Sequence, residues 1–124
     1  MIYDVAVIGA GVTGGLTAVA LAKYKLSVCL VEAGADVALG ATKANSAIVH
    51  GGYDPIPGTL KAKLNVKGAE MMADLCRRLD VHYKNNGSMV VAFDEEQLEH
   101  VRMLCERGKE SGVSGLSVIT GDEA

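Results

Sequence analysis

The sequence has few aromatic side chains and no excess of positive charge. Among its 124 residues there are no tryptophans, one phenylalanine and four tyrosines, and the formal net charge is −3. A surface that stacks single-stranded nucleic acid needs more aromatic rings than this. A groove for the phosphate backbone needs clustered lysine and arginine, whereas the basic residues here are dispersed. The composition therefore predicts no nucleic-acid partner.

Cysteine is also scarce. Cys29, Cys76 and Cys105 are the three cysteines, and no two of them have the C-x-x-C spacing. Three thiols cannot all pair, so we expect neither a disulfide framework nor a structural zinc site, and no other metal site is predicted. Reduced thiols packed as small apolar groups are typical of a cytoplasmic protein.

A membrane-spanning or secretory segment is not expected either. The uncharged stretch Val5–Ala22 is preceded by Asp4 and by no lysine or arginine, so it lacks the basic start of a signal peptide. Four glycines interrupt its middle (Gly9, Gly11, Gly14 and Gly15), which is a poor composition for a secretory or membrane-spanning core.

The first third of the sequence has the pattern of a strand–helix–strand unit. A short β-type run, Tyr3–Ile8, stops at glycine, as a buried parallel strand does. A helix is expected over Val12–Lys23 and a second buried strand over Leu26–Val31, which ends at Glu32. This order, within about 30 residues, predicts a βαβ unit.

The remaining sequence is less complete. Residues 33–58 are rich in glycine, contain both prolines and predict a long functional loop. Beyond it we expect an amphipathic helix over Thr59–Leu79, a strand over Ser88–Phe93, a helix from Asp94 to about Ser111, and a short strand over Leu116–Ile119. Two confident parallel strands are too few for a complete doubly wound sheet. We therefore interpret the chain as the N-terminal piece of a longer protein.

The first strand leads directly into a G-x-G-x-x-G motif, formed by Gly9, Gly11 and Gly14. Gly9 allows the tight turn, Gly11 allows close approach of a pyrophosphate, and Gly14 allows close helix–strand packing. The pyrophosphate would bind the free N–H groups at the positive end of the helix that begins near Val12. The motif alone is weak evidence, since simple tight turns match it as well.

Its context strengthens the interpretation. The motif follows a strand and opens a helix, and Glu32 ends the next strand at a spacing that suits a carboxylate bonding an adenosine ribose. The alternative for Glu32 is a solvated acid at the end of a strand. No lysine or arginine follows closely, which disfavours a ribose 2′-phosphate. The sequence thus predicts an adenine dinucleotide, either FAD or NAD.

The segment after the acid resembles one branch of the flavin enzymes. The run GATKANSAIVHGG at 40–52, together with YDP at 53–55, PGTLKA at 57–62 and GSMVVA at 87–92, is similar to FAD-dependent oxidoreductases of the D-amino-acid oxidase superfamily. Within that superfamily the likeness is to the glycerol-3-phosphate dehydrogenase and L-2-hydroxyglutarate oxidase branch. It covers essentially the whole chain, and the run at 42–52 is much more specific than the glycine motif.

The resemblance implies a fold, a cofactor and a set of contacts. It implies an incomplete α/β fold, with a Rossmann-like FAD-binding βαβ unit over 1–58 and part of a second, mixed α+β substrate domain over 59–124. In the family the loop after the acid follows the FAD pyrophosphate and ribityl chain. The expected cofactor-binding residues are therefore Gly9, Gly11, Val12, Thr13, Gly14, Glu32, Ala33, Thr42, Asn45 and Ser46. The alternative for the last three is a loop whose polar side chains satisfy its own turns.

The resemblance also implies a reaction. His50 is the candidate catalytic residue, expected near the flavin ring, where it would bond substrate, stabilise reduced flavin or carry a covalent flavin link. The alternative for His50 is a structural role. The implied chemistry is hydride transfer to flavin N5 from a hydroxyl-bearing carbon of a small molecule, such as glycerol 3-phosphate or a 2-hydroxy acid. The missing C-terminal part of the protein would supply most substrate contacts, so we expect the fragment alone to be inactive. Two alternatives are an NAD-binding module of a nicotinamide dehydrogenase and an inactive truncated remnant.

Overall fold

The computed structural model describes residues 2–124 and divides into two compact units, with the division between Ile48 and Val49. The domain boundary that we place between residues 58 and 59 stays a prediction.

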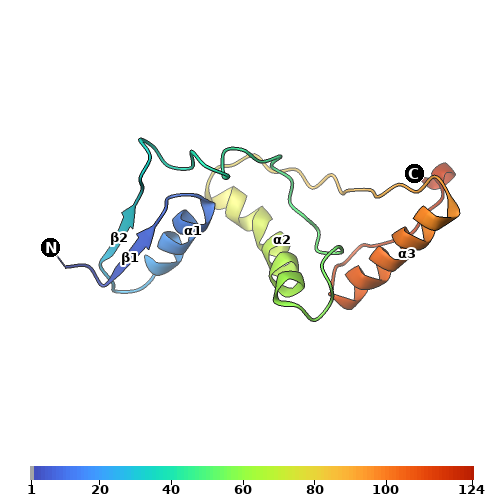
Figure 1. The fold of residues 1–124 in the computed structure, drawn as a ribbon, viewed down its shortest axis with the longest axis horizontal. Helices are drawn as coiled ribbons and strands as arrows, with labels where there is room; N and C mark the ends of the chain where they lie inside the picture. The colour runs from blue at the N-terminus through green and yellow to red at the C-terminus, as the bar shows by residue number, and fades with distance from the viewer. Residues whose placement is uncertain (1) are drawn as a thin grey trace. The chain divides into compact units, whose positions relative to one another are not determined.

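The first unit is the predicted βαβ unit. Strand β1 (Val5–Ile8) leads to helix α1 (Val12–Leu21), which returns the chain to strand β2 (Val28–Val31). The two strands pair in parallel, with Val5 opposite Val28 and Ile8 opposite Val31. Helix α1 packs against both strands, as Figure 1 shows. The sequence prediction of this unit is confirmed.

A polar pair joins the two strands where they begin. The Asp4 carboxylate accepts hydrogen bonds from the Ser27 N–H (2.8 Å) and from the Ser27 hydroxyl (2.6 Å). In return, the Asp4 N–H donates to the Ser27 carbonyl oxygen at 3.0 Å. The Ser27 hydroxyl and N–H hold the pKa of Asp4 below its usual range, because both bonds stabilise the charged carboxylate. The pair helps to fix the register of β1 and β2.

The second unit is built on two capped helices. Thr59 caps α2 by accepting a hydrogen bond from the Ala62 N–H at 3.2 Å, and Asp94 caps α3 by accepting one from the Gln97 N–H at 2.8 Å. The bounds of the helical segments are α2 (Leu60–Arg78), α3 (Glu95–Glu110) and the short 3₁₀ helix η1 (Gly121–Glu123). Both predicted helices are confirmed to within a residue or two at each end.

The two strands predicted in this unit are not formed. Ser88–Phe93 and Leu116–Ile119 are extended or irregular, and neither belongs to a sheet. The prediction was wrong because a strand is stable only when a neighbouring backbone satisfies its N–H and C=O groups. Within residues 2–124 the only sheet consists of β1 and β2.

The apolar core of the described chain is small. Its buried apolar residues are Ala10, Ala62, Leu104 and Cys105, whereas large side chains such as Ile8 (88% exposed) and Phe93 (88%) are open to solvent. Complete domains bury most of their large apolar side chains. The fold is therefore an incomplete α/β unit, as predicted. No helix within residues 2–124 has the length and apolar character needed to cross a membrane.

Candidate dinucleotide-binding site

The glycine motif forms a tight turn between β1 and α1. Gly9 has a φ of +94°, in the region that favours glycine, and its N–H donates to the Val31 carbonyl at 2.8 Å. A Cβ on Gly14 would lie 1.8 Å from the Gly9 carbonyl oxygen, so only glycine fits there. The turn can adopt this path because neither position carries a side chain.

The turn delivers the chain to the N-terminus of α1. Gly11 is the N-cap residue and offers no side-chain acceptor, so the Val12 N–H donates instead to Thr42 Oγ1 at 2.9 Å. A Cβ on Gly11 would be 3.0 Å from that same oxygen. The N–H groups of Thr13 and Gly14 belong to the first helical turn, where no carbonyl of the helix can accept from them. This end of α1 can therefore attract and bond an anionic group.

Glu32 binds the glycine turn directly. Its carboxylate accepts one hydrogen bond from the Gly34 N–H and one from the Ala10 N–H, both at 2.8 Å. These two N–H groups, with a smaller contribution from Ala33, hold the pKa of Glu32 below its usual range. The carboxylate is thus charged at neutral pH, and its remaining lone pairs can accept hydrogen bonds from hydroxyl groups.

The loop after Glu32 is fastened to the same turn. The Ala38 N–H donates to the Ala10 carbonyl at 3.1 Å, and Thr42 bonds Val12 as described above. Ala10 is therefore bonded through both its N–H and its C=O, and it is one of the few buried residues. Sequence reasoning missed Ala10 and Ala38, because their contribution is made by the backbone and leaves no residue-type signal.

The other predicted residues of this loop have mainly local or no contacts. The Asn45 side-chain NH₂ donates to the Thr42 carbonyl, and Asn45 Oδ1 accepts from the Ala47 N–H at 2.7 Å. These bonds form the local turn that we considered as the alternative for Asn45. Ser46 is exposed, as are Thr13 and Ala33. The structure thus brings Thr42 to the glycine turn, while Asn45 reaches the turn only through Thr42.

His50 belongs to the second unit and is exposed. It lies two residues before Gly52, which is buried and has a φ of +97°. Within residues 2–124, no cluster of three His, Cys, Asp or Glu side chains is arranged to hold a metal ion.

The first unit has the chemistry of an adenine-dinucleotide site. It offers backbone donors at a helix N-terminus for phosphate, a charged carboxylate for ribose hydroxyl groups, and a tight turn at which Gly9 presents no side chain. The Thr42 hydroxyl accepts from Val12 and keeps its own hydrogen to donate to a phosphate oxygen. The described residues therefore fit the adenosine and pyrophosphate portions of such a cofactor.

Nearly the whole chain is similar to proteins of one known family. The family model described as "FAD dependent oxidoreductase" matches residues 4–124. The chain is 49% identical, over 98% of its length, to glycerol 3-phosphate dehydrogenase of Caloramator mitchellensis, of which it covers 25%.

Two further relatives have related names. Identity is 34% to the mitochondrial L-2-hydroxyglutarate dehydrogenase of Pongo abelii, with 98% of this chain and 29% of that protein covered. Identity is 35% to glycerol 3-phosphate oxidase of Mycoplasma genitalium, with 89% of this chain and 29% of that protein covered. The chain spans between a quarter and a third of the length of these relatives.

Proposed function

The chain belongs to the FAD-dependent oxidoreductase family, and from this membership we propose that it is the N-terminal FAD-binding segment of an enzyme that oxidises a hydroxyl-bearing carbon. The substrate class is glycerol 3-phosphate or a 2-hydroxy acid, as in the names of the relatives. The observation that carries the cofactor part of the proposal is the bonded arrangement of Glu32, Ala10, Val12 and Thr42 around the end of α1.

The cofactor contacts follow from this arrangement. Gly9, Gly11 and Gly14 shape the turn, the Thr13 and Gly14 N–H groups bond the pyrophosphate, and the Val12 N–H holds the Thr42 hydroxyl beside it. The Glu32 carboxylate accepts hydrogen bonds from the ribose hydroxyl groups, and Ala33 follows it directly in the chain. Thr42, Asn45 and Ser46 line the path of the cofactor beyond the pyrophosphate. In this assignment Asn45 acts by fixing the conformation of the loop that carries Thr42.

The arrangement favours FAD over NAD within the described chain. Between Val31 and Leu60 there is no helix or strand, so a long irregular segment follows the ribose acid. Nicotinamide-binding units usually turn into the next helix soon after this acid. A long loop fastened to the glycine turn at Ala38 and Thr42 suits the ribityl chain and the large isoalloxazine ring, which make FAD longer beyond the pyrophosphate than NAD is.

When bound, FAD supplies the two-electron acceptor that takes a hydride from the substrate carbon. The task of the first unit is to hold the dinucleotide in one orientation, and the bonds of Glu32 and Thr42 prepare the turn for this before the ligand arrives. We assign to His50 the bond to the substrate hydroxyl, because a neutral imidazole can accept its proton as the carbon is oxidised.

We further propose that the enzyme works in the cytoplasm. The three cysteines are unpaired in the structure, and reduced thiols are typical of that compartment. The partner of the site is a small-molecule substrate.

The test uses the protein as encoded at its locus, with any residues that follow Ala124. We expect it to purify with bound FAD and to lose the absorption of oxidised flavin when glycerol 3-phosphate or L-2-hydroxyglutarate is added anaerobically. D-2-hydroxyglutarate is the matched control for stereochemistry. Bound FAD that neither candidate reduces would refute the substrate class. Purification with NAD and without flavin would refute the cofactor assignment.

A further inference from the structure

The chain just after His50 rests on helix α2 with no room for a side chain. Gly52 is buried, and a Cβ placed on it would lie 2.7 Å from Val66 Cγ2 and 3.3 Å from the Val66 backbone nitrogen. Its φ of +97° would strain any other residue as well. The backbone at Gly52 therefore packs directly on α2.

The next residue, Tyr53, packs in the same way on helix α3. A Cβ on Gly108 would lie 2.9 Å from Tyr53 Cβ, 3.3 Å from Tyr53 Cα and 2.3 Å from Leu116 Cδ1. Gly108 is buried in the last turn of α3, where alanine would be the better helix former. A glycine at such a position usually has a packing reason, and here the reason is the backbone of Tyr53.

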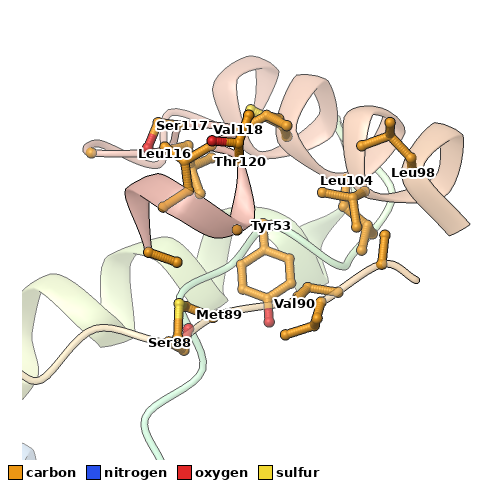
Figure 2. A pocket seen from close by; sticks show the side chains of 18 residues that line it. Tyr53, Ser88, Met89, Val90, Leu98, Leu104, Leu116, Ser117, Val118 and Thr120 are labelled. Carbon is orange, nitrogen blue, oxygen red and sulfur yellow. The ribbon is translucent and has the colours of Figure 1, made fainter. Parts of the chain in front are cut away.

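The Tyr53 side chain is half-buried. Its ring lines a cavity of about 330 Å³ together with Met89, Val90 and Leu104. Figure 2 shows the ring between the segment that carries Met89 and Val90 and the helix that carries Leu104. Gly52 thus packs on α2, and the next residue, Tyr53, packs on α3 and lines the cavity.

We propose that Gly52 and Gly108 are positioning residues that fix the backbone carrying His50. The inference rests on the role proposed above for His50. Two peptide links separate His50 from Gly52, so their Cα atoms can be no more than about 7 Å apart. Gly108, which is far from His50 in the sequence, acts through Tyr53, whereas Gly52 acts directly on the segment.

The contacts of Gly108 differ in how easily they yield. Leu116 Cδ1 is the end of a flexible side chain and can turn away from an added methyl group. Tyr53 Cβ and Cα are fixed to the backbone, so an added methyl group must displace the Gly52–Tyr53 segment. Gly108→Ala should therefore shift the segment even when Leu116→Ala removes the other contact.

The experiment compares Gly108→Ala with Gly68→Ala in the FAD-loaded protein as encoded. Gly68 lies in α2, is exposed and has no atom within 4 Å of an added Cβ, so it is the matched control. The first readout is amide hydrogen exchange of a peptide that covers residues 49–54. The second is the rate of flavin reduction by substrate, measured with and without His50→Ala.

We expect faster exchange over residues 49–54 in Gly108→Ala and unchanged exchange in Gly68→Ala. Flavin reduction should slow by about tenfold to a hundredfold in Gly108→Ala, the range for a reacting group displaced by about 1 Å. In the His50→Ala background the same change should cost less than about twofold, because residues that act through one group are not additive. The loss should persist in Gly108→Ala/Leu116→Ala.

Other results would overturn the inference. Equal exchange in Gly108→Ala and Gly68→Ala would show that the segment is not held by α3. Equal losses of rate in both His50 backgrounds would show that Gly108 does not act through His50. If His50→Ala leaves flavin reduction unchanged while Gly108→Ala speeds exchange, the proposed role of His50 is refuted and the packing of the segment stands.

Discussion

Gly14→Ala is the substitution for which the structure makes the sharpest prediction. The added Cβ would lie 1.8 Å from the Gly9 carbonyl oxygen and 3.0 Å from the Gly9 carbonyl carbon. Both atoms belong to the backbone of the turn, so no side-chain rotation can relieve the overlap. Helix α1 and the turn would have to separate by about 1 Å, which the dense packing of backbone on backbone resists.

The cost can be estimated from overpacking of well-packed sites, which is about 1–3 kcal/mol. In the free protein, a shift of α1 away from β1 relieves part of this strain. Binding of the cofactor requires the original spacing, since the free N–H groups of Thr13 and Gly14 must face the pyrophosphate. The strain is then restored on binding, and the affinity for FAD should fall by about 5-fold to about 150-fold.

The assay is a titration of FAD by flavin fluorescence, with Gly15→Ala as the matched control. Gly15 is the next residue of the same helix, and no atom lies within 4 Å of a Cβ placed there. Gly15→Ala should bind FAD as the unaltered chain does, and it should stabilise the helix by up to about 1 kcal/mol. Equal affinity in Gly14→Ala and Gly15→Ala would refute the packing argument.

Three further predictions concern other parts of the chain. Gly11→Val should abolish FAD binding in the same titration, because the branched valine side chain would occupy the pyrophosphate position and contact Thr42 Oγ1. Unaltered affinity for FAD would contradict the assignment of the turn. FAD affinity should be constant at neutral pH and should fall only in acid below the usual pKa range of a glutamate, because the Gly34 and Ala10 N–H groups lower the pKa of Glu32 and their bonds are lost when it is protonated. The decline should vanish in Glu32→Gln, which should already bind more weakly at neutral pH. Asp94→Ala should destabilise α3 by about 0.5–2 kcal/mol through loss of the cap on the Gln97 N–H, and thermal unfolding followed by circular dichroism should show it, whereas Asp94→Ser should retain most of the stability.

The βαβ unit could be predicted from the sequence because its signals are local. Alternating or continuous apolar runs gave β1 and β2, and the glycine motif marked the turn between β1 and α1. Apolar residues at helical spacing predicted α2, and Asp94 followed by Gln97 predicted the start of α3, because a capping side chain bonds an N–H only a few residues away. These features depend on neighbours in the chain, which a sequence displays directly.

The prediction of strands at Ser88–Phe93 and Leu116–Ile119 was wrong because a strand depends on a partner that is distant in the sequence. Their residues favour extended backbone, but a strand also needs a partner, and the partner is not dictated by the residues of the segment itself. The contacts of Ala10 and Gly108 were likewise hidden. They arise where backbones approach each other, and an alanine or a glycine in a sequence does not indicate which distant segment it will contact.

The site was predictable in part. Glu32 and the three glycines could be placed from spacing, and the structure brings them to one turn. The bond from Val12 to Thr42 spans residues far apart in the sequence, and only the resemblance to flavin enzymes suggested that Thr42 would lie near the cofactor. The position of Asn45 in a local turn follows from its ordinary tendency to bond neighbouring backbone groups.

The central claim is that the first unit is built to hold FAD. Its most direct test is a fluorescence titration of the purified chain with FAD, repeated in the presence of excess NAD. We predict saturable binding of FAD that NAD does not displace. Saturable binding of NAD with no binding of FAD would contradict the claim.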